Sequence, residues 1–213
     1  MNRIADVTGD VAEDRARRVG TLPAIPSVAS RVGSRRTWLK LASAAAVVAA
    51  GGCRAEQPGA AIPARLPDFG AASRERWINS APLTALALAG RPVLVEFWTF
   101  GCSNCRNTLP WLKAVHARYA SRGLVVVGVH TPEFDSERDP AAVLAATRYL
   151  GIAYPVLLDP DSRYWNAFAN RYWPAFHLYD RDHRHVASRI GELHQGRERA
   201  DSFEAAIDGV LAR

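Results

Sequence analysis

The sequence predicts an α/β domain whose central mixed β-sheet is flanked by helices. Apolar runs alternate with segments of helical period through the middle of the chain, as in strands joined by crossover helices. Near the end, residues 176–179 and 186–190 flank a polar turn, which favours an antiparallel hairpin. A C-x-x-C pair, Cys102 and Cys105, directly follows one apolar run.

Each expected element has its own signal. Residues 93–98 are apolar apart from Glu96, which is typical of a strand buried on both faces. Helical spacing predicts a helix over 103–122, and β-branched residues after Gly123 predict a strand over 124–129. The remaining expected elements are a helix over 139–150, a strand over 155–158, a short helix over 161–169, the hairpin, and a last amphipathic helix with Phe203, Ile207, Val210 and Leu211 on one face.

Composition divides the chain into three parts. Residues 68–213 form one domain by size. Residues 54–67 are rich in Ala, Pro and Gly without an apolar period, which predicts a flexible tether. Residues 1–53 carry eight basic and four acidic side chains, so +4 of the net charge of +6 lies there. The basic balance therefore indicates targeting, and we expect no nucleic-acid partner.

Residues 1–53 end in a pattern typical of an export signal. Arg35 and Arg36 precede an apolar stretch over 39–52 that is too short for a bilayer core, which needs about twenty residues. The alternative is an ordinary Ala-rich helix with an unrelated cysteine. The segment resembles a twin-arginine signal, and residues 50–53 resemble a lipobox. This resemblance implies that Cys53 is lipid-modified and anchors an exported, extracytoplasmic domain to a membrane.

The C-x-x-C pair predicts disulfide exchange. Residues three apart at the start of a helix share one face, so the two sulfurs can close a small ring. Cys102 is expected at the N-cap, exposed, where unpaired N–H groups and the helix dipole favour a thiolate, while Cys105 is covered. Cys102 is then the nucleophile and Cys105 releases the mixed disulfide. A metal clamp is the alternative, but the sequence has no second cysteine pair to complete one.

The whole folded part resembles the thioredoxin fold, with the inserted strand–helix unit over residues 133–158 that marks the exported thiol-disulfide oxidoreductases of the TlpA/ResA group. It most resembles the thioredoxin-like domain of DipZ proteins. The resemblance is carried by residues 77–83, 93–105, 108–112, 128–134 and 165–174.

The resemblance assigns three kinds of site residue. Glu96 matches a buried acid that accepts a proton from Cys105, although a strand-edge glutamate reaching solvent is the plain structural alternative. Pro174 matches a cis-proline beside the dithiol, against a trans proline at a strand entry. Trp98 and Trp173 are expected to flank the sulfurs as an apolar platform for a substrate, although aromatic residues are more often plain core.

The resemblance also implies partners and a direction of electron flow. The uncharged Ser103-Asn104 pair favours a reductase, re-reduced by a CcdA-like or DsbD-like membrane protein, with apocytochrome c thiols as one substrate. We expect a monomer that needs no cofactor beyond the Cys102–Cys105 disulfide, binds no metal and supports redox homeostasis. Two alternatives remain open: a copper-delivery module, which would want C-x-x-x-C and a distal His, and a thiol peroxidase or general antioxidant.

Overall fold

The structure, a computed structural model, describes residues 61–213. The predictions that concern Arg35, Arg36 and Cys53, and those for residues 54–60 of the tether, lie outside the described residues. Among residues 61–213, no helix is long and apolar enough to cross a membrane.

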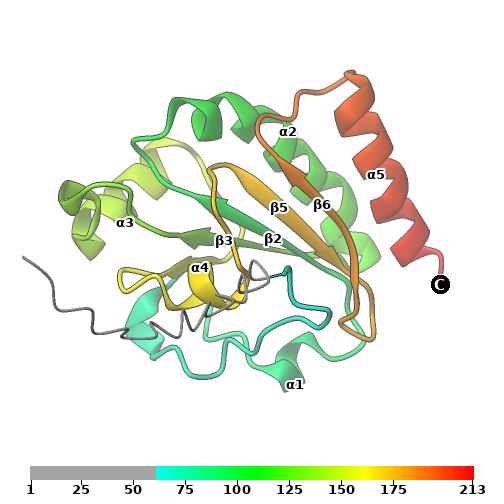
Figure 1. Ribbon diagram of the computed structural model, residues 1–213, viewed down its shortest axis with the longest axis horizontal. Helices are drawn as coiled ribbons and strands as arrows, with labels where there is room; N and C mark the ends of the chain where they lie inside the picture. Colours follow the sequence, from blue (N-terminus) through cyan, green and yellow to red (C-terminus); the bar gives the residue numbers. More distant parts are fainter. Residues whose placement is uncertain (1–60) are drawn as a thin grey trace, which may run out of the picture. The chain divides into compact units, whose positions relative to one another are not determined.

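A six-stranded mixed sheet forms the centre of the domain (Figure 1). Its strands are β1 (Trp77–Ile78), β2 (Val93–Trp98), β3 (Val125–His130), β4 (Val156–Leu158), β5 (Ala175–Tyr179) and β6 (His185–Ile190). They lie in the order β1-β4-β3-β2-β5-β6. Strands β2, β3 and β4 are parallel, and the other pairs are antiparallel. The mixed sheet agrees with the fold class that the sequence predicts.

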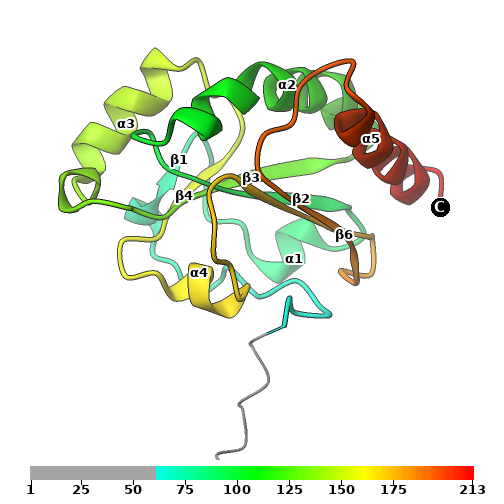
Figure 2. The same ribbon diagram turned by 45° about the horizontal axis from the view of Figure 1, so that its top comes forward.

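Helices cover both faces of this sheet. They are α1 (Ala85–Leu88), α2 (Ser103–Tyr119), α3 (Pro140–Tyr149), α4 (Arg163–Ala167) and α5 (Glu198–Leu211), with short 3₁₀ helices η1 (Arg74–Arg76), η2 (Ala120–Arg122) and η3 (Asp135–Glu137). Figure 2 shows α2, α3 and α5 on one face and α1 and α4 on the other. Strands β2, β3, β4 and β5 are therefore buried on both faces, as continuous apolar runs require, whereas the edge strand β6 is only partly covered.

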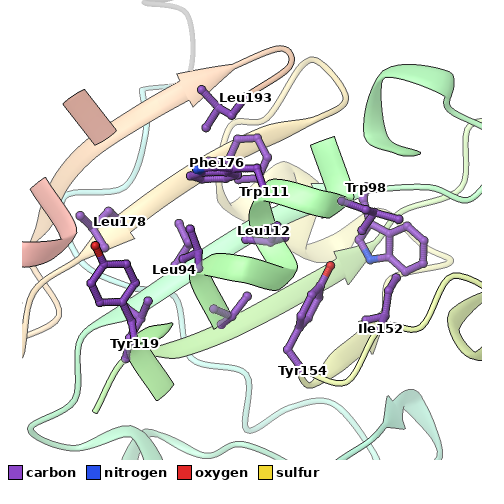
Figure 3. Packing of buried hydrophobic residues seen from close by; sticks show 14 of the residues in the cluster. Leu94, Trp98, Trp111, Leu112, Tyr119, Ile152, Tyr154, Phe176, Leu178 and Leu193 are labelled. Carbon is purple, nitrogen blue, oxygen red and sulfur yellow. The ribbon is translucent and has the colours of Figure 1, made fainter. Parts of the chain in front are cut away.

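Strand β2 is buried along its whole length because it lies between β3 and β5. Alternate side chains point to opposite faces of a strand, so Leu94 and Val95 enter two different cores. Figure 3 shows the core on the α2 side, where Leu94 packs with Leu112 of α2 and Leu178 of β5. The site elements thus rest on the most enclosed strand of the sheet.

Most expected elements are present, with shifted ends. The predicted helix over 103–122 leaves α-geometry at Tyr119 and continues as η2, which ends at Gly123 with a positive φ of 104°. Helix α3 begins at Pro140, one residue after the expected start, because Asp139 is its N-cap and the Asp139 carboxylate accepts the Ala141 N–H at 3.0 Å. Strand β1 was not predicted, because two residues carry no detectable period.

The end of the predicted tether is fixed to the hairpin. The Leu66 N–H donates to the His183 carbonyl at 2.9 Å, and the His185 N–H donates to the Ala64 carbonyl at 3.0 Å. Open backbone groups along a hairpin readily pair with another segment. Residues 64–66, which belong to the stretch predicted as a tether, therefore contact the hairpin.

Candidate active site

The two cysteines lie at the start of α2, which follows β2 after a short turn. Cys102 is the N-cap, and its Sγ accepts the Cys105 N–H at 3.2 Å. Both are free thiols, Cys102 partly exposed and Cys105 only 1% exposed. This is the arrangement that the spacing predicts: one sulfur that a partner can reach and one that it cannot.

The covered thiol strongly resists ionisation. Burial raises the pKa of Cys105 far above that of a free thiol, and the nearby Cys102 and Glu96 raise it further. A buried thiolate next to a second negative charge is costly, so Cys105 keeps its proton until a base removes it.

Glu96 lies completely inside the domain. It sits in the central strand β2, which excludes the alternative of a strand-edge glutamate that reaches solvent. The Tyr154 hydroxyl donates to Glu96 Oε2 at 3.0 Å, whereas Oε1 has no hydrogen-bond partner among the described residues. Burial raises the pKa of Glu96 to about 8, with the Tyr154 hydrogen bond opposing that rise. Glu96 can therefore gain and lose a proton near neutral pH.

Tyr154 is a site residue that sequence reasoning missed. Gly128 pairs with Glu96 across β2 and β3, and its lack of a side chain leaves space for the Tyr154 ring. A β-carbon at Gly128 would lie 3.0 Å from both Tyr154 Cε2 and Trp98 Nε1. A glycine among the valines of β3 was the available signal, because glycine inside a strand often marks a close approach.

Trp98 does not form part of an exposed platform. It is 1% exposed and packs edge-on against His130, with ring centroids 5.1 Å apart. Figure 3 shows its indole inside the apolar cluster, next to Ile152. The expectation for Trp98 was wrong in this respect, because the end of a central strand is already covered by α2 and the neighbouring strands.

Trp173 and Pro174 do lie beside the dithiol. The Trp173–Pro174 peptide is cis, as the resemblance implies, and the Trp173 ring packs against Trp165 with centroids 4.1 Å apart and the ring planes tilted by 34°. An open groove of about 460 Å³ runs past Cys102. It is lined by Gly101, Cys102, Ser103, Asn104, Glu133, Phe134, Arg171, Tyr172 and Trp173.

Two exposed aromatic residues of this groove were also missed. Phe134 is 61% exposed and Tyr172 is 57% exposed, and they come from different segments, the loop after β3 and the loop before β5. Exposed aromatic side chains beside a reactive sulfur are suited to contact a partner.

A metal clamp is the alternative to disulfide exchange. Among residues 61–213, no group of three or more His, Cys, Asp or Glu side chains could hold a metal ion.

Known proteins resemble this chain over much of the part that the structure describes. The AhpC/TSA family model matches residues 62–186. Protein DipZ of Mycobacterium tuberculosis is 39% identical over 107 residues, which cover 49% of this chain but only 15% of DipZ. Thiol-disulfide oxidoreductase YkuV of Bacillus subtilis is 28% identical over 136 residues, 64% of this chain and 88% of YkuV.

Solved structures show the same fold. A thioredoxin-like protein solved in its oxidized form is 26% identical, with a TM-score of 0.59 over 71% of this chain and 98% of its own. A thiol-disulfide isomerase from Corynebacterium glutamicum is 20% identical, with a TM-score of 0.57 over 70% and 96%. The fold is therefore thioredoxin-like, and since the family model matches more than half of its residues, the chain belongs to the AhpC/TSA family.

Proposed function

We propose that this protein is a thiol-disulfide oxidoreductase that reduces disulfides of other proteins. The observation that carries the proposal is the pair of unequal sulfurs at the start of α2, with Cys102 open to the groove and Cys105 buried behind it. The YkuV relative, named as a thiol-disulfide oxidoreductase, supports the proposal.

The reaction needs two exchange steps. The Cys102 thiolate attacks one sulfur of the partner's disulfide, forming a mixed disulfide, and the partner's other sulfur leaves as a thiolate that takes up a proton. Cys105 then loses its proton and attacks Cys102 Sγ, which releases the partner's second thiol and leaves a Cys102–Cys105 disulfide. The partner gains two electrons and the dithiol loses two.

Glu96 is the proton acceptor for the second step. Its Oε1 has no hydrogen-bond partner among residues 61–213, and although burial is the main cause of the raised pKa of Cys105, a charge on Glu96 raises it further. A base with a pKa near 8 is matched to work near neutral pH. Tyr154 supports this role because its hydroxyl stabilises the carboxylate form.

The direction and place of the reaction follow from the sequence. Ser103 and Asn104 add no charge beside Cys102, which favours a reducing couple. We place the enzyme outside the cytoplasm, exported by the signal over 1–53 and anchored through Cys53. There it would act on exported disulfides, apocytochrome c among them, and a CcdA-like or DsbD-like membrane protein would restore the dithiol.

The first prediction separates the two sulfurs. The full chain should reduce insulin with a dithiol donor, and Cys102→Ser should abolish that activity because the attacking sulfur is gone. Cys105→Ser should instead accumulate a mixed disulfide on Cys102, detectable by mass spectrometry. Cys53→Ser is the matched control and should keep full activity. Insulin reduction that survives Cys102→Ser would refute the mechanism.

The second prediction concerns the redox potential. Equilibration of the full chain with glutathione should give a midpoint of roughly −200 to −270 mV, the range of reducing thioredoxin-like dithiols. A midpoint near about −120 mV, typical of a strong oxidant, would reverse the assigned direction of electron flow.

The third prediction concerns Tyr154→Phe. A hydrogen bond to a charged group contributes about 1.5–3 kcal/mol, and one pKa unit equals about 1.4 kcal/mol. Losing the donor should therefore raise the pKa of Glu96 by about one unit or more, so that the release step reaches its full rate only at higher pH. Stopped-flow decay of a mixed disulfide between pH 6 and 10 measures this.

Two further variants complete that experiment: one is a control with the same substitution elsewhere, and the other removes the proton acceptor. Tyr179→Phe removes a buried hydroxyl from the other core, where Tyr179 donates to the Pro63 carbonyl at 3.3 Å, and should leave the profile unchanged. Glu96→Gln should slow release at every pH and remove its dependence on a group of pKa near 8. An unaltered pH profile in Tyr154→Phe would show that the hydrogen bond does not tune the acceptor.

A further inference from the structure

Glu137 is a buried acid in an otherwise exposed loop. Residues 131–139 connect β3 to α3, and from residue 133 onward all of them are exposed except Glu137, which is 2% exposed. Burying a carboxylate costs free energy unless its oxygens are well hydrogen-bonded. The hydrogen bonds that the Glu137 carboxylate accepts therefore explain how its side chain can be buried.

The two carboxylate oxygens hold two different segments. Oε1 accepts the Gly101 N–H at 2.9 Å, while Oε2 accepts the N–H groups of Glu133 at 2.7 Å and Phe134 at 3.1 Å. Burial alone would raise the pKa of Glu137, but these N–H groups and the Thr99 hydroxyl outweigh it and hold the pKa below its usual value. No Lys, Arg or His within residues 61–213 forms an ion pair with it. Backbone N–H groups and one hydroxyl, rather than a positively charged side chain, therefore stabilise the carboxylate.

The peptide before the nucleophile is held from both sides. The Glu137 carboxylate packs so closely on Gly101 that a β-carbon there would collide with Oε1. On the other side, one guanidinium nitrogen of Arg106 donates to the Gly101 carbonyl at 3.0 Å and to the Phe100 carbonyl at 2.7 Å. Cys102 thus follows a peptide unit that is fixed at its N–H and at its carbonyl.

Both segments that Glu137 holds line the groove at Cys102. Gly101 and Cys102 belong to the part of the lining that carries the nucleophile, and Glu133 and Phe134 belong to a separate part. One carboxylate therefore sets the distance between these two parts of the groove. A partner's segment that brings its disulfide to Cys102 along this groove would contact both parts.

We propose that Glu137 is a positioning residue that fixes the groove at Cys102 and so controls the access of protein disulfides. This inference rests on the proposed function. It predicts that loss of Glu137 harms reactions with large disulfides, which need the groove, far more than reactions with small ones, which need only the exposed sulfur.

The test compares two disulfides in the full chain carrying Cys53→Ser, so that Cys102 and Cys105 supply the only thiols. Stopped-flow rate constants are measured with insulin and with the small aromatic disulfide DTNB. Glu137→Gln should slow the insulin reaction by about tenfold and the DTNB reaction by no more than about twofold, since small displacements of a positioned group can cost up to about a hundredfold. Asp139→Asn, the same charge change in the same loop, should alter neither rate.

A double-mutant cycle tests the contact itself. Gly101→Ala should slow the insulin reaction because its β-carbon meets the carboxylate, and Glu137→Ala should slow it because the groove loosens. The double variant removes the collision, so its loss should be smaller than the product of the two single losses. Independent, multiplicative losses would overturn the proposed contact.

The remaining outcomes are also decisive. An unchanged insulin rate in Glu137→Gln, or equal slowing with both disulfides, would overturn the proposal while leaving the proposed function intact. Insulin reduction by the parent chain that does not require Cys102 would instead overturn the proposed function. Should the Glu137 variants not fold, amide exchange in the parent chain decides: the Gly101 N–H should be protected, and rapid exchange would refute the hydrogen bond.

Discussion

The site depends on one constraint, the burial of β2 between its two neighbours in the sheet. That burial keeps Glu96 out of water, and the strand ends directly at the turn that places Cys102 on the N-terminus of α2. The acid, the exposed sulfur and the covered sulfur therefore come from one short stretch of chain, 96–105. A rigid strand and a rigid helix fix their relative positions more firmly than loops would.

The rest of the domain completes this arrangement from distant segments. Tyr154, just before β4, donates to the buried acid, and Glu137, after β3, holds the peptide before the nucleophile. Both come from the unit inserted over 133–158. This unit thus does more than enlarge the sheet: it contributes one group to the covered side of the dithiol and one to the exposed side. The two sulfurs differ in accessibility because Cys105 is buried in the core whereas Cys102 lines the groove.

The sequence was sufficient for whatever is local or strongly patterned. Alternating apolar runs predict the strands and helices, and the C-x-x-C spacing predicts one exposed and one covered sulfur. It was insufficient for contacts between distant segments: no local pattern links Tyr154 to Glu96 or Glu137 to Gly101. Trp98 shows the converse limit, since the family resemblance implied a platform beside the dithiol, whereas the side chain is 1% exposed and packs in the core.

In the proposed mechanism, Glu96 is a proton acceptor that titrates near neutral pH. This can be measured by carbon-13 NMR of glutamate side-chain carboxyls in the reduced full chain, assigned by comparison with Glu96→Gln. We expect the Glu96 signal to titrate with a midpoint near pH 8. A midpoint near 4.5, that of an unperturbed glutamate, would contradict it.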